Sequence, residues 1–221
     1  MRAEGEVTLR GGVLRKRNEG RRRAARHRDS LPVVSAAPII APTGVRMTFE
    51  EAAKLDPDTW RGDIVDGVWV AVPKSTWRHG AILANMVFLL KLHARTHPGL
   101  SVAVADPGVK LSRDPDVLRG PDAAVIRAER VPTGKGVAGW LDGAPDLAVE
   151  VVGDGQTVTG MLKKAAQYLR AGAKAVWVVD PDPAQVAVIT AGGLTVLGSD
   201  DTIEGGDALP GFACTVSEFF A

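Results

Sequence analysis

Two carboxylate residues stand inside apolar segments whose composition predicts buried strands. The first is Glu150, in the run PDLAVEVV of residues 145–152, which a Gly follows. A continuous apolar run of this length predicts a strand that is buried on both faces. An unpaired carboxylate would cost several kcal/mol there, so we expect the group to be protonated, paired or bound to a cation.

The second carboxylate is Asp122, which follows Pro121 at the start of the apolar segment PDAAVI. If the two strands pair, the two carboxylates converge at one place in a sheet. Such oxygen donors repel each other unless a hard cation such as Mg²⁺ or Mn²⁺ lies between them. Each acid taken alone has another explanation, a strand end that reaches solvent or an ion pair with Lys or Arg. Together they predict a candidate metal site.

A basic residue should accompany such a metal if the site hydrolyses a phosphodiester. That reaction needs an activated water and a stabilised anionic transition state. The helix expected after Glu150 offers Lys163 and Lys164. Its buried stripe is expected to contain Met161, Ala165, Tyr168 and Leu169. Lys164 then lies on the flank of this stripe and Lys163 points away from it, so Lys164 is the better candidate.

The surrounding segments predict the elements that position these side chains. A short helix begins at Thr48, Asp66 and Gly67 form the turn of a β-hairpin over residues 62–72, and the longest helix lies within residues 75–99. The other expected elements are strands at 101–106, 108–112, 121–126 and 174–180, a loop at 113–120, an amphipathic helix at 161–172, a hairpin at 184–200 and a short helix at 215–221. This order predicts an α/β domain with a mixed β-sheet flanked by helices and additional β-hairpins.

The bulk composition limits the class of protein. The chain has 221 residues, of which 45% are hydrophobic, enough for one core, or for one domain plus an appendage. Its single cysteine, Cys214, excludes an intrachain disulfide framework and suits a reducing cytoplasm. No apolar stretch approaches the roughly 18 residues that a membrane span requires. We therefore expect a cytoplasmic protein without a membrane partner.

The charges divide the chain into two parts. Residues 1–46 contain eleven Lys or Arg and four Asp or Glu, a balance of +7, whereas residues 47–221 have a balance of −6. The first part is interpreted as a basic, flexible extension, and residues 47–221 as the folded domain. Three explanations of the extension stay open: an arm that grips the phosphate backbone, a targeting segment, and an upstream extension before a start at Met47.

Asp122, Glu150 and a following lysine resemble the PD-(D/E)XK nuclease superfamily, which is restriction-endonuclease-like in fold. Residues 47–221 as a whole are similar to its Uma-two family of endonucleases. The matching pieces are GDIVDGVWV, RHG, GVKLS, GPDAAVI, PDLAVEVV, KAAQYLRAGA, VWVVDP and ALPGFACTVSEFF. The resemblance implies a mixed sheet of four to five strands, a Mg²⁺ or Mn²⁺ ion held by Asp122 and Glu150, and hydrolysis of nucleic acid.

The resemblance also assigns roles to other residues. It places the catalytic lysine at Lys164, because KAAQY matches the family's lysine-to-tyrosine spacing, while the usual position two residues after the Glu is Val152. Asp63 stands where the family usually has Glu and supports the metal, and His79 matches a recurrent His that contacts phosphate or caps the helix. The family's Ser-Pro loop is replaced here by residues 153–160, GDGQTVTG.

These features predict a metal-dependent endonuclease with nucleic acid, DNA first, as its substrate. Because cleavage of a duplex takes two sites, a homodimer is expected. The alternative is a catalytically degenerate domain that binds nucleic acid or protein, which the acidic balance favours. A basic surface near Asp122 is expected from Lys110, Arg113, Arg119, Arg127 and Arg130. Trp140, in a Gly-rich loop, is the aromatic residue expected at the surface, whereas Trp69 and Trp177 are expected in the core.

Overall fold

The computed structural model describes residues 43–56 and 61–221. Most of the predicted basic extension, residues 1–42, lies outside the described residues, so its three explanations and the boundary at residue 47 stay predictions. In the described part of the chain, no helix has the length and apolar character needed to cross a membrane.

The elements follow one another in the predicted alternation of strands and helices. The helices are α1 (Phe49–Ala52), α2 (Trp77–Thr96) and α3 (Val158–Arg170), with the 3-10 turns η1 (Ala128–Arg130), η2 (Gly136–Gly139) and η3 (Val216–Phe219). The strands are β1 (Gly62–Val65), β2 (Val68–Ala71), β3 (Leu100–Val104), β4 (Val109–Ser112), β5 (Val117–Arg119), β6 (Ala123–Arg127), β7 (Leu141–Asp142), β8 (Leu147–Val151), β9 (Ala175–Asp180), β10 (Gln185–Thr190), β11 (Gly193–Leu197), β12 (Thr202–Glu204) and β13 (Ala213–Thr215).

The strands form two mixed sheets and a separate two-stranded ribbon. One sheet has the order β2-β1-β5-β4-β7 and the other the order β11-β10-β9-β8-β6-β3, while β12 pairs with β13. The pairs β8–β9 and β4–β7 are parallel, and the remaining pairs of the two sheets are antiparallel. The prediction of a single sheet of four to five strands is therefore wrong, because the strands form one sheet of five and one of six. The mixed α/β class is confirmed.

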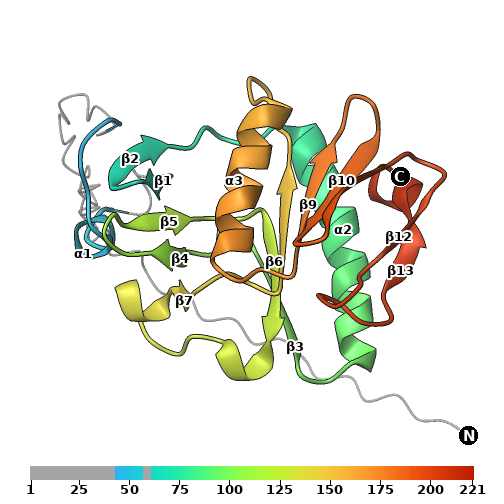
Figure 1. Ribbon diagram of the computed structural model, residues 1–221, viewed down its shortest axis with the longest axis horizontal. Helices are drawn as coiled ribbons and strands as arrows, with labels where there is room; N and C mark the ends of the chain where they lie inside the picture. The colour runs from blue at the N-terminus through green and yellow to red at the C-terminus, as the bar shows by residue number, and fades with distance from the viewer. Residues whose placement is uncertain (1–42, 57–60) are drawn as a thin grey trace, which may run out of the picture. The chain divides into compact units, whose positions relative to one another are not determined.

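Helices cover both faces of the six-stranded sheet (Figure 1). Alternate residues of a strand point to opposite faces. Accordingly Leu147 and Val149 of β8 pack in the cluster that contains α2 and the C-terminal segment, whereas Ala148 packs in the cluster that contains α3. Glu150 has the same parity as Ala148, so its side chain points toward α3.

The five-stranded sheet has a separate small core. Phe49 of α1, Ile64 of β1, Trp69 of β2 and Leu118 of β5 are buried together. A further cluster joins the two sheets, because Ile126 of β6 packs against β4 and β7. The junction between the sheets is thus fixed by apolar contacts.

Most of the predicted local signals are confirmed. Thr48 and Glu51 form a capping box at α1. Asp66 and Gly67 both have positive φ, as a two-residue hairpin turn requires, and they connect β1 to β2. The start of α3 differs from its expected position at residue 161: the helix begins at Val158, because Thr157 caps it by accepting a hydrogen bond from the Gly160 amide.

Three local predictions need correction. The stretch 113–120, predicted as a loop, contains β5. The last helix is a 3-10 turn rather than an α-helix. Among the tryptophans, Trp69 and Trp177 are buried as predicted, but Trp140 is half-buried against the core of the five-stranded sheet. Among the described tryptophans the exposed one is Trp77 instead, with 93% of its surface accessible.

Candidate active site

The two strands that carry the candidate acids are neighbours. Strands β6 and β8 pair antiparallel, with Ala123 opposite Val149. One step along this register places Asp122 next to Glu150. The Asp122 carboxylate reaches across to the end of β8, where its Oδ2 accepts a hydrogen bond from the Val151 amide at 2.7 Å. The predicted convergence of the two acids in one sheet is therefore observed.

Glu150 is buried, and donors from α3 occupy both of its oxygens. The Nζ of Lys164 lies 2.8 Å from Oε1 and 2.9 Å from Oε2. The hydroxyl of Tyr168 donates to Oε1 at 2.9 Å. Because Lys164 and Tyr168 are four residues apart, one face of α3 presents both donors to the strand. In the described structure, the burial of Glu150 is thus offset by partners within the chain.

Lys164 connects the two sheets. Besides Glu150, its ammonium donates to the Gly120 carbonyl at 3.0 Å and lies 3.8 Å from Oδ2 of Asp63. Lys163, by contrast, is exposed. The sequence-based choice between these two lysines agrees with their positions.

Asp63 enters the site from β1 and is buried. Its Oδ1 accepts a hydrogen bond from the Gly120 amide at 3.1 Å, and its Oδ2 accepts one from Nη1 of Arg119 at 3.0 Å. Asp63 thus joins the candidate site as predicted, with its charge offset mainly by Arg119.

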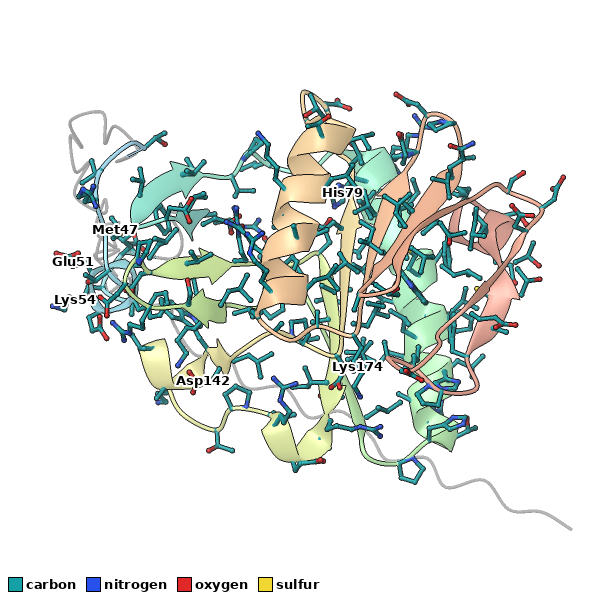
Figure 2. All side chains as sticks on the ribbon, in the orientation of Figure 1. Met47, Glu51, Lys54, His79, Asp142 and Lys174 are labelled. Atoms are coloured by element: carbon teal, nitrogen blue, oxygen red, sulfur yellow. The ribbon has the colours of Figure 1, made fainter. Side chains whose placement is uncertain are left out.

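His79 lies on the first turn of α2 (Figure 2). Its Nε2 is 3.1 Å from Oδ1 of Asp122, and its backbone amide is capped by Thr76. The side chain therefore orients Asp122 rather than capping the helix. The two predicted roles of His79 were contact with phosphate and capping, and the capping role falls to Thr76.

The electrostatic environment shifts the pKa values of these groups. Burial, together with the nearby Asp122 charge, raises the pKa of Glu150 to about 7, despite the opposing effect of Lys164. Burial would lower the pKa of Lys164, but Glu150 and Asp63 raise it above its ordinary value. Burial and the Glu150 charge raise the pKa of Tyr168, so its hydroxyl stays a donor. The hydrogen bond that His79 makes to the Asp122 carboxylate raises the pKa of His79, against the effect of burial.

The shifted pKa of Glu150 predicts how stability depends on pH. The folded state holds this proton more tightly than the unfolded state, in which the pKa is 4.5, so the carboxyl contributes stability at low pH. That contribution is lost as the pH rises from about 4.5 to about 7, and it amounts to roughly 3 kcal/mol. Urea denaturation of the metal-free protein should therefore show the stability of the wild type falling relative to Glu150→Gln across this range. A difference independent of pH would contradict the raised pKa.

The five predicted site residues line one cavity. Asp63, His79, Asp122, Glu150 and Lys164 all contribute to its wall, and its volume is about 1170 Å³. The segment 153–160, which replaces the family's Ser-Pro loop and whose last three residues begin α3, borders the same cavity. A cavity with a few convergent polar groups and a strongly shifted carboxyl is the expected form of an active site.

The donor set suits a hard cation, although the carboxylates are already hydrogen bonded. Among the described residues, no group of three or more His, Cys, Asp or Glu is arranged as a ready set of metal ligands. Mg²⁺, however, commonly takes one or two protein carboxylates and completes its shell with water and substrate phosphate. Asp122 and Glu150 supply oxygen donors of that kind, so the residues fit Mg²⁺ or Mn²⁺ if the ion displaces some of their present partners.

Of the five cations expected to form a basic surface near Asp122, all except Arg127 pair with acids in the described part of the chain. Lys110 pairs with Asp142, Arg113 with Glu50, Arg119 with Asp63, and Arg130 with Asp146. These four cations therefore neutralise acids of the chain itself.

Three residues of the site were not predicted as members of it. Tyr168 was assigned to the apolar stripe of α3, although a buried tyrosine hydroxyl normally needs a partner, which is a signal that the sequence did contain. Arg119 was assigned to a nucleic-acid surface, and Gln167, which accepts a hydrogen bond from it, was not singled out. The pairing of β5 with β1 positions Arg119, and no local pattern indicates that pairing.

The fold resembles that of a solved nuclease-like protein. The structure is similar to the crystal structure of a putative nuclease of the DUF820 family from Anabaena variabilis, with a TM-score of 0.69 over 79% of this chain and 97% of that chain. Since the two sequences are 20% identical, the likeness establishes the fold alone. This chain is an α/β protein with a nuclease-like fold.

The sequence identifies the family within that class. Residues 48–217 match the Uma2 family, which is described as putative restriction endonuclease. The chain belongs to the Uma2 family, as its motifs predicted. A search of curated proteins found no match.

Proposed function

We propose that this protein is a metal-dependent endonuclease that hydrolyses phosphodiester bonds of nucleic acid, with DNA as the first substrate to test. The observation that carries the proposal is the contact between Lys164 and Glu150 beside Asp122 in a single cavity. Two carboxylates from paired strands and a lysine from the following helix combine ligands for a hard cation with a group that stabilises an anion.

The acids are assigned to the metal. Asp122 and Glu150 would bind Mg²⁺ or Mn²⁺ directly, and Asp63 would contribute from the outer coordination shell. A bound ion would supply Lewis-acid stabilisation of the phosphoryl oxygens and a more acidic water. His79 holds the Asp122 carboxylate in its orientation through the 3.1 Å contact.

Lys164 is assigned to the substrate. Its ammonium lies next to Glu150 and so stands close to any phosphate held at that carboxylate. If the carboxylate were shared with an ion, the ammonium would be free to orient the attacking water or to donate to a phosphoryl oxygen. The Gly120 carbonyl, 3.0 Å away, keeps one of its protons engaged and limits its movement.

The test is a cleavage assay with defined substrates. The full chain is incubated with supercoiled plasmid, single-stranded DNA and single-stranded RNA, each with Mg²⁺, with Mn²⁺ and with excess chelator. Metal-dependent cleavage that is absent in Glu150→Gln supports the proposal. Cleavage that persists in the variant shows a contaminating nuclease or a different site, and it would overturn the assignment.

A second candidate function is that of a non-catalytic binding domain. It is favoured because donors of the chain itself already bind all three carboxylates of the site. Lys164, Arg119, His79 and the Val151 amide already satisfy the three carboxylates. A nuclease-fold domain without turnover would keep this arrangement and bind nucleic acid or protein. Salt-dependent binding of DNA without cleavage under any metal condition is the result that selects it.

A further inference from the structure

Arg119 occupies the junction between the two sheets, and it is a cation of the cavity to which the proposed function gives no role. Its side chain is only 12% exposed. We propose that Arg119 is a positioning residue, which fixes Asp63 and the helix α3 so that Lys164 is directed to Glu150. This inference rests on the proposed function, because it concerns the same site.

The first contact of Arg119 is with the five-stranded sheet. Its Nη1 donates to Oδ2 of Asp63 at 3.0 Å, while the next residue, Gly120, donates its amide to Oδ1 at 3.1 Å. Both carboxylate oxygens of Asp63 are thus held by consecutive residues at the end of β5. These two hydrogen bonds hold the Asp63 side chain in an orientation in which Arg119 balances its charge.

The second contact of Arg119 is with α3. Its Nε donates to Oε1 of Gln167 at 2.8 Å. Gln167 follows Lys164 by three residues, so the two side chains project from neighbouring positions on the helix. A guanidinium holds its donors in a rigid planar fork, a fixed geometry that the rotatable donors of a lysine ammonium do not reproduce. Arg119 therefore sets the spacing between β1 and the part of α3 that carries Lys164.

The position of Arg119 affects which of two acids, Glu150 or Asp63, pairs with Lys164. Its ammonium is 2.8 Å from Glu150 and 3.8 Å from Oδ2 of Asp63, the oxygen that Arg119 occupies. Without Arg119, Asp63 would be a buried carboxylate short of a cation, and Lys164 would be the nearest replacement. A shift of Lys164 by about 1 Å is enough to lower a rate by about 10²-fold.

The experiment compares variants of the full chain with bis(p-nitrophenyl) phosphate as the probe and Mn²⁺ as the metal. We expect Arg119→Gln to lower kcat about 100-fold with KM changed less than twofold. Gln167→Met, which leaves every charge in place, should lower kcat about fivefold at unchanged metal affinity. Arg119→Lys should fall between the two. Arg170→Gln, an exposed position on the same helix, serves as the control.

A double variant separates positioning from a general loss of structure. If Asp63 captures Lys164 when Arg119 is absent, removing the Asp63 charge releases it again. Whatever Asp63→Asn costs by itself, Arg119→Gln should then lower kcat much less in the Asp63→Asn background than in the wild type, and this non-additivity should appear in kcat among variants that circular dichroism shows to be folded. Losses that multiply in the double variant would overturn the inference.

Two further results would also overturn it. If Gln167→Met and Arg119→Lys both had the wild-type kcat, Arg119 would act only through its positive charge and not by positioning α3. An increased KM at constant kcat in Arg119→Gln would make it a substrate-binding residue. Failure of the proposed function would look different: the wild type itself would neither cleave the probe nor bind Mn²⁺ in calorimetry. In that case the inference about Arg119 would be overturned as well.

Discussion

Glu150→Gln is expected to lower metal-dependent cleavage at least about 10³-fold and to abolish Mg²⁺ binding. The carboxylate is the buried member of the pair that faces the cavity, and its amide replacement has one oxygen and no charge with which to attract a divalent ion. The amide still fills the same volume and still accepts a hydrogen bond, so the packing of β8 against α3 is retained. The loss should therefore be one of function rather than of fold.

Calorimetric titration of the metal-free protein with Mg²⁺ measures this effect directly, and circular dichroism checks that the variant is folded. Asp154→Asn is the matched control, because Asp154 borders the same cavity but is exposed and follows the end of β8. It should bind Mg²⁺ as the wild type does. Equal Mg²⁺ affinity in the wild type and Glu150→Gln would mean that Lys164 and Tyr168 are the only partners that this carboxylate requires.

The sequence predicted the elements of the site better than the architecture around it. Periodicity and caps located the long helix, the hairpin at Asp66-Gly67 and the buried strand of Glu150, because each depends on interactions between residues close in sequence. The second sheet was missed because β5 has three residues and lies within a stretch rich in turn-forming and charged residues. Only its pairing with β1 and β4, across more than fifty residues in the first case, makes it a strand.

The same distinction applies within the site. The position of Lys164 follows from helix geometry relative to its own apolar stripe, so it was predictable. The partner of Asp63 was not, because Arg119 reaches it across a contact between residues 56 positions apart. The ion pair between Asp146 and Lys174, which precede β8 and β9, was equally hidden. Neither residue lines the cavity, and Figure 2 labels Lys174. Sequence patterns thus identified the residues of the candidate site, including Lys164 as the partner helix residue, but not the guanidinium of Arg119 that offsets the charge of Asp63.

Lys164→Met is expected to separate metal binding from turnover. The ammonium holds both oxygens of Glu150, so a Mg²⁺ ion must compete with it for the carboxylate. Removing the ammonium lifts this competition, and the affinity for Mg²⁺ should rise. At the same time the site loses the cation assigned to the transition state, so kcat should fall about 10²- to 10³-fold. Tighter Mg²⁺ binding together with a lower kcat would show that Lys164 pairs with Glu150 in the metal-free protein and stabilises the anionic transition state during the reaction.

Lys163→Met provides the matched control, because it removes the same charge from the adjacent, exposed position. Calorimetry and the plasmid assay should both return wild-type values for it. If Lys164→Met instead weakened Mg²⁺ binding, the lysine would act by holding Glu150 in place rather than by competing for it. The resting contact between Lys164 and Glu150 would then be part of the metal site's framework, and the role in stabilising the anionic transition state would have to pass to another cation of the cavity.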